Sequence, residues 1–490
     1  MAYSAGEEAL AASYDAVIVG SGMGASAVAL KLGQAGLKVL MVERGQWEPR
    51  PDVHEPNRFV YDQQSPEDDF NIVGGRSKYY GAALYRFRKS DFTEVEFDTG
   101  VSPAWPISYE DLEPHYDEAE RLYRVHGAPD GDPTDPHGDH AYPFPALPDD
   151  PVIADVRRKL EATGHKTAHI PRGLDYGPGR ACSLCADCSA HYCRADAKMD
   201  AEVATLRPAF ETGNVTLLDH AECLKVLTNG NGTRADGVLV NHLGEEKTIR
   251  AGRVIISAGF RHTPALLRRS RSDAHPEGLG NGGGWLGKGV AAHSTGTLFP
   301  LIQLNRLGPR HTNTLAIHAW MAEDADEDCR HPLGVVQVSG QTPFWRLTSK
   351  LKRPVIKAVA ERTLNVFHMT EALPDKGTGW TFDGDTPANF TPPRFQQATY
   401  ERLKAKTQTA FRKAGYQVIT PRREVALWHE TGGAIMGNDD RDSVVDAHGR
   451  VHGLENVFVA DASVLPSASA VNTGLTIVAL ALRTADATLA

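Results

Sequence analysis

The sequence has no uninterrupted apolar run of about 20 residues, the length that a transmembrane helix requires. It also lacks an excess of positive charge, because 52 lysine and arginine residues face 62 aspartate and glutamate residues, giving a net charge of −10. The first absence argues against a membrane protein, and the second argues against a nucleic-acid-binding protein. Internal repeats and low-complexity tracts are absent too. We therefore expect a globular protein that has neither a membrane nor a nucleic acid as partner.

The N-terminal stretch lacks the features of a secretory signal. Its first twenty residues, MAYSAGEEALAASYDAVIVG, contain two glutamates and have neither a basic region nor a cleavable apolar segment. A secretory signal needs both, so we expect a cytoplasmic protein. At 490 residues, with 41% hydrophobic and 23% charged residues, the chain exceeds one ordinary globular domain. Two closely joined domains are predicted, with long surface loops where proline and aspartate cluster at residues 126–151.

The strongest local pattern is a βαβ unit in YDAVIVGSGMGASAVALKLGQAGLKVLMVERG. A buried strand from Ala16 to Val19 is followed by an amphipathic helix and by a second strand from Val39 to Val42. Between the first strand and the helix, Gly20 permits a tight turn and Gly22 lets the backbone approach a pyrophosphate at the helix N-terminus. The small side chain of Ala25 allows the helix to pack closely on the strand. This arrangement is typical of a dinucleotide-binding fold.

An acidic residue ends the second strand of this unit. Glu43 follows Gly22 by 21 residues, where a carboxylate accepts hydrogen bonds from an adenosine ribose and repels a 2′-phosphate. A tight turn without any ligand would explain the glycines alone. Here strand, helix, second strand and acid all stand in register, so the sequence predicts a bound dinucleotide, either FAD or NAD.

A second glycine cluster follows in DFNIVGGRSKYYGAALYRFRKSDF. It comes too late to belong to the βαβ unit and contains no further phosphate-binding helix start. Gly74 and Gly75, together with Ser77 and Gly81, favour a backbone that lies flat against a bulky planar group. This cluster favours a flavin as the cofactor.

Two further segments complete a resemblance to the glucose-methanol-choline (GMC) oxidoreductases, flavoenzymes that oxidise alcohols. They are VIISAGFRHTPALLRRS, at 254–270, and WHETGGAIMG…SVVDAHGRVHGLENVFVADASVLPSASAVNTGLTIVALALR, at 428–483. The resemblance implies an α/β fold (α+β overall), with a Rossmann-like FAD-binding domain and a discontinuous substrate domain built on an antiparallel sheet. The implied FAD-binding domain comprises residues 13–75, 201–293 and 429–490, and the substrate domain comprises residues 76–200, with a cysteine-rich segment, and 294–428.

The C-terminal segment contains the candidate catalytic pair. Oxidation of an alcohol requires a base with a pKa near the working pH to remove the hydroxyl proton, and a second polar group to hold the oxygen. His429 and Asn472 match the His-Asn pair of some family members, so the resemblance assigns proton removal to His429 and oxygen binding to Asn472. Hydride would pass to flavin N5. Taken singly, His429 could be a structural histidine at the turn, and Asn472 could be a helix N-cap.

The resemblance also implies a set of FAD-binding residues. Asp461 and Ala462 correspond to the place where the last strand meets the flavin diphosphate and ribityl chain, and Thr473 to Thr476 open a helix facing the flavin pyrimidine. Cys223 corresponds to a residue that contacts the adenine through its backbone, although a small buried core residue explains it equally. The whole predicted set is Gly20, Gly22, Met23, Gly24, Ala25, Glu43, Arg44, Gly74, Gly75, Ser77, Gly81, Cys223, Ala258, Gly259, Asp461, Ala462, Thr473 and Thr476.

The sequence departs from the family pattern at two places. Family members usually have proline after the catalytic asparagine, whereas Thr473 stands here, which affects the expected approach of the backbone to the flavin. Some relatives attach FAD covalently to a histidine in the glycine cluster. Lys78, Tyr79 and Tyr80 occupy the corresponding positions, so we expect FAD to be bound without a covalent link.

Four of the six cysteines lie within CSLCADCSAHYC, as Cys182, Cys185, Cys188 and Cys193. The spacing is close to a ferredoxin motif, but its last gap is one residue longer and no proline follows. Zinc usually needs a longer spacer between cysteine pairs, and disulfides are unusual in a cytoplasmic protein. An iron–sulfur cluster, a zinc site, disulfides and reduced structural thiols all remain open, with no metal site assigned.

The predicted function is FAD-dependent oxidation of an alcohol group on a small polar molecule to an aldehyde or ketone. The resemblance is greatest to bacterial members that act on sugars, polyols and amino-sugars such as aminoglycoside precursors. Oxygen or another electron acceptor would reoxidise the flavin, and a homo-oligomer is left open. Three alternatives are a dehydrogenase subunit that passes electrons to an iron–sulfur cluster or a partner, a non-redox FAD-containing lyase of the same fold, and a nicotinamide-dependent reductase.

Overall fold

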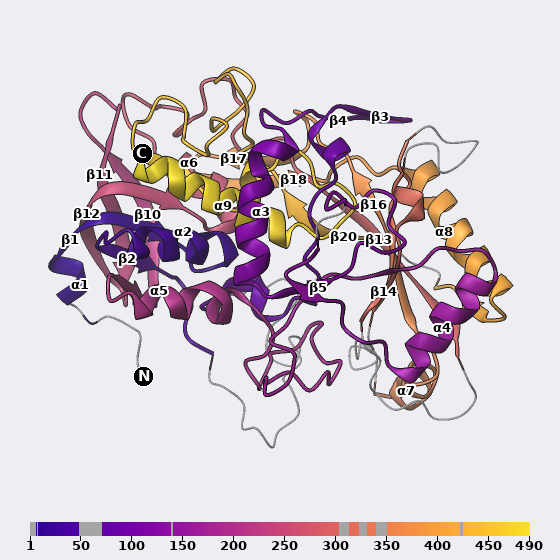
Figure 1. Cartoon of the computed structure of the whole chain (residues 1–490). Coiled ribbons are helices and arrows are strands. Elements are labelled where there is room, and N and C mark those ends of the chain that lie inside the picture. Colours follow the sequence, from indigo (N-terminus) through magenta and orange to yellow (C-terminus); the bar gives the residue numbers. More distant parts are fainter. Residues whose placement is uncertain are drawn as a thin grey trace.

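The computed structural model describes residues 6, 8–48, 71–138, 141–302, 313–322, 331–339, 350–421 and 425–490. Within them, two large sheets lie side by side, each with its own helices (Figure 1). One sheet draws its strands from widely separated parts of the chain, and the other comes mostly from the second half. The candidate site described below lies where the two sheets meet.

The first sheet has the strand order β10-β11-β12-β1-β2-β9, and β21 also pairs with β12. β12, β1, β2, β9 and β21 run parallel, while β10 and β11 form an antiparallel extension. The parallel strands contain buried apolar runs, such as AVIV in β1 and VLMV in β2, as expected for strands covered on both faces. Their bounds are β1 Ser13–Val19, β2 Val39–Val42, β9 Val215–Leu218, β10 Ala221–Thr228, β11 Ala235–His242, β12 Glu245–Ile256 and β21 Val457–Val459.

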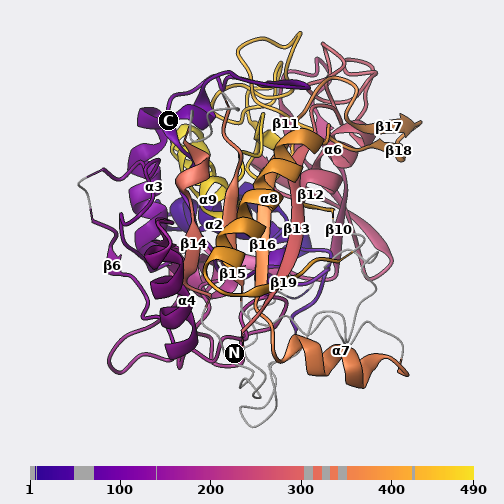
Figure 2. The same cartoon turned by 90° about the vertical axis from the view of Figure 1, so that its right-hand side faces the viewer.

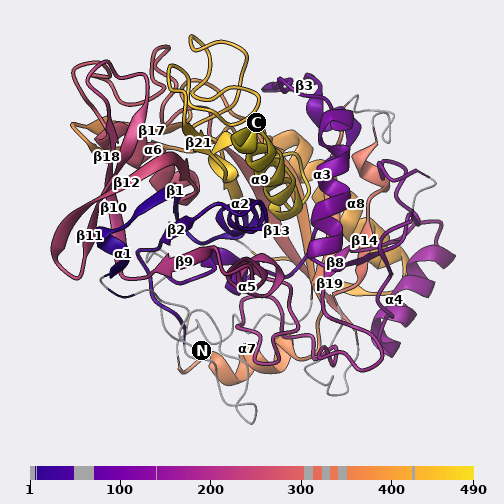
Figure 3. The same cartoon turned by 60° about the vertical axis from the view of Figure 1, so that its left-hand side comes forward.

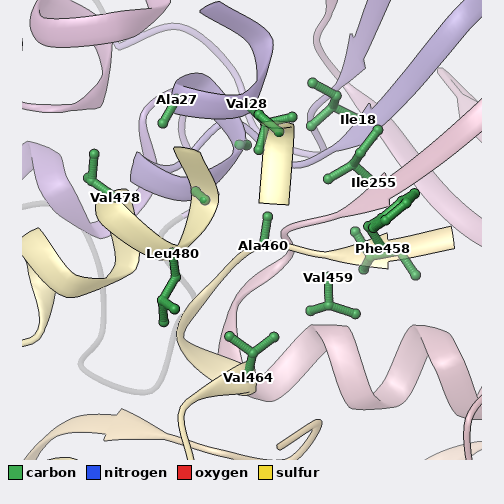
Figure 4. Close-up of a cluster of buried hydrophobic side chains, with 14 of the residues drawn as sticks. Ile18, Ala27, Val28, Ile255, Phe458, Val459, Ala460, Val464, Val478 and Leu480 are labelled. Carbon is green, nitrogen blue, oxygen red and sulfur yellow. The ribbon is translucent and has the colours of Figure 1, made fainter. Parts of the chain in front are cut away.

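Two helices from opposite ends of the sequence cover this sheet together. α2 (Met23–Gln34) packs against α9 (Gly474–Leu489), and α3 (Tyr109–Leu122) lies beside α9 (Figure 3). Figure 4 shows the apolar core that they share with β1, β12 and β21. At Gly24 a Cβ atom would lie 1.8 Å from the carbonyl oxygen of Ala460, so only glycine lets α2 approach the end of β21 this closely.

The second sheet is antiparallel, with the order β19-β13-β16-β15-β14-β7, and β20 pairs with β13. α8 (Gln397–Lys413) lies across β13 and β16 (Figure 2), burying Leu403 and Phe411 from its apolar face. The strand bounds are β7 Ala168–His169, β13 Ala291–Leu301, β14 Leu315–Ile317, β15 Val335–Ser339, β16 Asn365–Ala372, β19 Gln417–Ile419 and β20 Ala426–Thr431.

The remaining elements are small or peripheral. α7 buries none of its side chains, and α6 packs against β10. The helix bounds are α1 Glu8–Ala11, α4 Pro151–Ala162, α5 Arg207–Glu211, α6 Gly259–Arg269 and α7 Arg353–Ala360, and the minor strands are β3 Val95–Phe97, β4 Gly100–Ser102, β5 Val125–Gly127, β6 Phe144–Pro145, β8 Arg172–Gly173, β17 Gly379–Asp383 and β18 Thr386–Thr391.

A buried group of charged side chains, which we call the ionic cluster, joins α3 to the segment after β5. Its members are Arg86, Glu120, His137 and Asp135. Arg86 donates to both carboxylate oxygens of Glu120, at 2.9 and 2.7 Å, and His137 bridges Glu120 (2.9 Å) and Asp135 (2.6 Å). His137 is only 2% exposed. The prediction of a surface loop at 126–151 is therefore wrong at this residue, because the two carboxylates hold its ring inside the protein.

The predicted fold class is confirmed, since a mostly parallel sheet with covering helices adjoins an antiparallel sheet. The strands predicted at Ala16 to Val19 and Val39 to Val42 fall within β1 and coincide with β2. Among the described residues, no helix combines the length and the apolar character needed to cross a membrane. β13 and β20 run across the proposed domain boundaries at 293/294 and 428/429, so His429 lies on a strand of the second sheet.

Candidate active site

A cavity of about 420 Å³ opens at the carboxyl ends of β1, β2, β12 and β21 and reaches β20 of the second sheet. In an α/β sheet this edge is the usual place for a ligand. The structure brings almost all predicted site residues to its wall: Gly20, Gly22, Met23, Gly24, Glu43, Arg44, Gly74, Gly75, Ser77, Gly81, Cys223, Ala258, Gly259, His429, Asp461, Ala462, Asn472 and Thr473.

Two predicted cofactor-binding residues do not line the cavity. Ala25 is fully buried, as expected for the close packing of α2 on the sheet. Thr476 points to the other side of α9, where its hydroxyl lies 2.7 Å from the hydroxyl of Tyr116 on α3. Thr476 therefore joins two helices, and the start of α9 faces the cavity through Thr473 and Gly474 instead.

Three helices begin at the wall of this cavity. Gly22, Ala258 and Thr473 are the N-cap residues of α2, α6 and α9, and in the described part of the chain none of them caps its helix with a side-chain hydrogen bond. The first N–H groups of a helix carry a partial positive charge and need an acceptor, which Asp461 already supplies to Gly259 of α6. The cavity therefore suits a ligand with several anionic or hydrogen-bond-accepting groups.

The space before Gly22 and the carboxylate of Glu43 fit a dinucleotide. A Cβ atom at Gly22 would meet no protein atom within 4 Å, so protein packing does not explain this glycine, whereas room for a ligand does. Glu43 accepts hydrogen bonds from Ser21 Oγ (2.6 Å) and from the N–H of Gly45 (2.7 Å). Burial raises the pKa of Glu43, and these two hydrogen bonds only partly offset that effect.

Asp461 holds two walls of the cavity together. One carboxylate oxygen accepts from the N–H and hydroxyl of Ser463, at 2.8 and 2.6 Å. The other accepts from the N–H of Gly259 (2.8 Å) and the hydroxyl of Thr263 (2.5 Å). The side chain thus fixes the start of α6 against the end of β21, and both elements then present their backbone to the cavity.

A bulge in the second sheet aims His429 at the cavity. Ala291 pairs with Thr431 and His293 pairs with Trp428, so β20 has one more residue than β13 between these pairs. His429 has a φ of 57°, the left-handed conformation that a non-glycine residue rarely adopts. Bulges of this kind redirect side chains next to functional sites. The histidine consequently leaves the regular alternation of the strand.

Asn472 and His429 meet in this cavity. Asn472 Nδ2 lies 3.3 Å from His429 Nε2, and Gln337 Nε2 of β15 donates to Asn472 Oδ1 at 2.8 Å. On the other side of the ring, His429 Nδ1 lies 2.9 Å from Nδ1 of His293. Asn472 is not the N-cap of α9, because Thr473 takes that position. Its carboxamide is thus part of the polar site and not a helix cap.

Both histidines are neutral near pH 7. Burial, aided by His293 and Arg76, lowers the pKa of His429 to about 3. Burial also lowers the pKa of His293 to about 4, partly offset by its hydrogen bond to the carbonyl of Ala468. The sequence led us to expect a base with a pKa near the working pH. The structure differs because desolvation of the ring by the surrounding protein favours the neutral imidazole, which has a lone pair ready to accept a proton.

Sequence reasoning missed several residues at the site. Arg76 Nη1 lies 3.3 Å from Glu430 Oε2, and both residues line the cavity. Glu430 directly follows His429, and this adjacency was the only available signal. His293 and Gln337 lie on strands of the second sheet, and no local motif marks them. Only the pairing of β13 with β20, and of β15 with β16, brings them to the site.

The cysteine-rich segment forms a separate region. Cys182, Cys185, Cys188 and Cys193 line a second, small cavity of about 40 Å³, and no disulfide joins them in the part of the chain that the structure describes. Lys198, which is fully buried, donates to four carbonyl oxygens there, those of Lys78, Tyr80, Cys188 and His191. No group of three or more histidine, cysteine or acidic side chains among the described residues is placed to hold a metal ion. Reduced structural thiols, zinc and an iron–sulfur cluster stay predictions for this segment.

Comparison with known proteins places most of the chain in one family. Residues 15–295 and 352–481 match the family described as GMC oxidoreductase, and the first match alone spans more than half of the chain.

Individual relatives cover nearly the whole chain. The 6′′′-hydroxyparomomycin C oxidase of Streptomyces lividus is 28% identical over 97% of this chain and 91% of its own length. The paromamine 6′-oxidase of Streptomyces fradiae is 26% identical over the same shares. Among solved structures, pyridoxine 4-oxidase from Mesorbium loti has a TM-score of 0.66 at 18% identity, covering 96% of this chain and 98% of its own. This last similarity shows a shared fold.

Proposed function

The chain belongs to the GMC oxidoreductases, and on that premise we propose that it oxidises a hydroxyl group of a small polar molecule to an aldehyde or ketone. Family membership implies FAD as the cofactor. The observation that carries the proposal is the meeting of His429 and Asn472 in the same cavity that has the dinucleotide motif at its wall. An alcohol oxygen that contacts both side chains would lie inside this cavity.

The residues present fit FAD. Gly22 and the start of α2 would hold its diphosphate, Glu43 its ribose, and the starts of α6 and α9 its flavin half. When bound, FAD supplies an acceptor for the hydride that leaves the alcohol carbon. We infer non-covalent binding, because Lys78, Tyr79 and Tyr80 occupy the segment that attaches FAD in some relatives. Denaturation should then release the cofactor.

His429 and Asn472 would divide the remaining work. The neutral ring of His429 accepts the hydroxyl proton at Nε2. The N–H₂ group of Asn472 donates to the substrate oxygen and stabilises the negative charge that develops there. Neither step requires another titrating group in contact with the alcohol.

We propose a sugar, a polyol or an amino-sugar as the substrate. The Streptomyces relatives are named for aminoglycoside substrates. In this chain the carboxylate of Glu430 lies at the cavity next to His429, where it can bind an ammonium group. Its partner Arg76 is more than half exposed, so a cationic substrate could replace that pairing at little cost.

Anaerobic mixing of the holoenzyme with sugars, amino-sugars and simple alcohols tests the proposal. Bleaching of the flavin by at least one alcohol is expected, and His429→Ala should slow it by about 10²-fold or more, the scale of general-base catalysis. His448→Ala, at an exposed histidine, serves as the control and should leave the rate unchanged. Product formation without any bleaching would instead indicate the lyase, and an unchanged rate in His429→Ala would remove that residue from the mechanism. Adding oxygen or a dye to the reduced enzyme then identifies the acceptor.

A further inference from the structure

We propose that His293 is a positioning residue that holds the ring of His429 in the tautomer with its proton on Nδ1, leaving Nε2 free to accept the substrate proton. The inference rests on the proposed function and deepens it, because it says how the base is kept in its reactive form. It concerns a buried histidine that lies behind His429 and does not itself line the cavity.

The backbone carbonyl of Ala468 fixes the tautomer of His293. His293 Nε2 lies 3.0 Å from the carbonyl oxygen of Ala468, and a carbonyl can only accept a hydrogen bond. The proton of His293 must therefore be on Nε2. Since His293 is completely buried and neutral, its Nδ1 carries a lone pair and no proton.

The tautomer of His293 in turn fixes the tautomer of His429. His429 Nδ1 lies 2.9 Å from that lone pair, which is a hydrogen bond only when His429 Nδ1 carries the proton. A neutral imidazole has one N–H, so His429 Nε2 must be the unprotonated nitrogen. The carbonyl of Ala468 thus determines, through the rings of His293 and His429, that the unprotonated Nε2 of His429 faces the site.

The hydrogen bonds on the other side of the His429 ring agree with this tautomer. Gln337 donates to Asn472 Oδ1 at 2.8 Å, which turns the N–H₂ group of Asn472 toward His429 Nε2. A donor facing an unprotonated nitrogen is favourable, whereas a donor facing an N–H would be repulsive. The arrangement on both sides of His429 therefore selects the same tautomer.

The carbonyl of Ala468, at which this series of hydrogen bonds begins, is itself held in place. The N–H groups of Ala468 and Ser469 both donate to Glu371 Oε1 at 3.2 Å, and the hydroxyl of Ser102 donates to the same atom at 3.0 Å. Glu371 of β16 stands directly opposite His293 of β13 in the sheet. A rigid sheet register thus sets the distance between His293 and its acceptor.

Two substitutions at one position separate this role from simple packing. In His293→Asn the side-chain oxygen can still accept from His429 Nδ1, whereas His293→Leu keeps the bulk but offers no acceptor. His368→Leu is the matched control, because His368 is a fully buried histidine of the same sheet whose ring nitrogens have no hydrogen-bond partner among the described residues.

The direct measurement is ¹⁵N NMR of histidine-labelled protein, with the His429 signals assigned by their loss in His429→Ala. Wild type, His293→Asn and His368→Leu should show His429 protonated at Nδ1 and bare at Nε2. His293→Leu should show a shift toward the form protonated at Nε2. The same His429 ¹⁵N signals in wild type and in His293→Leu would overturn the proposal. A wild-type His429 ring protonated at Nε2 would overturn it as well. If His293→Leu fails to fold, the wild-type spectrum alone decides.

Rates of anaerobic flavin reduction give the second readout. His293→Leu should be slowed about 10-fold or more with its FAD content retained, while His293→Asn stays within about 3-fold of wild type. Equal slowing in His293→Leu and His368→Leu would reduce His293 to a packing residue. If no alcohol reduces the wild-type flavin, the proposed function fails, yet the NMR result still decides the tautomer.

Discussion

Two buried polar regions of this protein hold their ionisable groups in opposite states. In the ionic cluster, burial disfavours charge on Glu120, but hydrogen bonds from Arg86 and His137 outweigh it and lower the pKa of its carboxyl. At the candidate active site, burial prevails. It lowers the pKa values of His293 and His429 to about 4 and about 3, and it raises the pKa of Glu371 to about 7.

The difference lies in the partners. Each charged group of the ionic cluster faces an opposite charge at hydrogen-bond distance, so the cluster stays ionised and joins α3 to the segment after β5. His293 and His429 face each other and a backbone carbonyl, and Glu371 faces hydroxyl and N–H groups and the like-charged Asp91. The first arrangement is suited to structure. The second keeps both imidazoles uncharged, the state that the proposed role of His429 as a base requires.

Breaking the ionic cluster should have the largest effect. Arg86→Met removes the cation and leaves the carboxylate of Glu120 buried with only His137 beside it, which should cost about 3–5 kcal/mol of unfolding free energy. Urea unfolding of the holoenzyme near pH 7 measures this loss. A loss below about 1 kcal/mol would show that the cluster is less dependent on its charges than its geometry indicates.

The pKa of Glu371 is raised, whereas that of Glu120 is lowered, so the two carboxyls should make stability depend on pH in opposite senses. The raised pKa of Glu371 means that, between about pH 4.5 and 7, the folded protein keeps a proton that the unfolded chain releases, so stability falls as pH rises through this window. Glu371→Gln can still accept from Ala468, Ser469 and Ser102 but no longer titrates. Relative to wild type it should gain up to about 3 kcal/mol on going from pH 4.5 to pH 8. Parallel pH profiles for the two proteins would contradict a raised pKa.

The smallest effect should come from replacing Asp117, a surface partner of the buried Arg86. Asp117 accepts from Arg86 at 2.7 Å, as close as Glu120, but its side chain is 50% exposed against 2% for Glu120. Asp117→Asn should therefore cost less than about 1 kcal/mol in the same urea experiment. A cost equal to that of Arg86→Met would mean that burial does not explain the strength of the cluster.

Short-range features of the fold were predictable from the sequence. The apolar runs of β1 and β2, the glycines between β1 and α2, and the acid at the end of β2 depend on neighbours in the chain, and the structure has them as expected. The environment of the candidate catalytic pair, His429 and Asn472, was not predictable in the same way. The left-handed conformation of His429 arises from a bulge that exists only when β20 pairs with β13.

Long-range pairing also explains what was missed. His293 reaches His429 because β13 and β20 are neighbours, and Gln337 reaches Asn472 from β15. A local reading has no information on which strands become neighbours. The prediction of a base with a pKa near the working pH fails for the same reason, since the burial that lowers the pKa of His429 comes from several distant segments. The assignment of roles to His429 and Asn472 remains a prediction.

The central sheet has a consequence for how the protein is made. β12 lies between β1 and β21, so strands from the beginning, middle and end of the chain complete one surface. During synthesis β1 and β2 leave the ribosome long before β12 and β21, and their unpaired edges must wait for partners. The wall of the cavity is complete only after the segment around Asn472 has emerged. A chaperone that shields those early strands would therefore raise the yield of active enzyme without altering the enzyme itself.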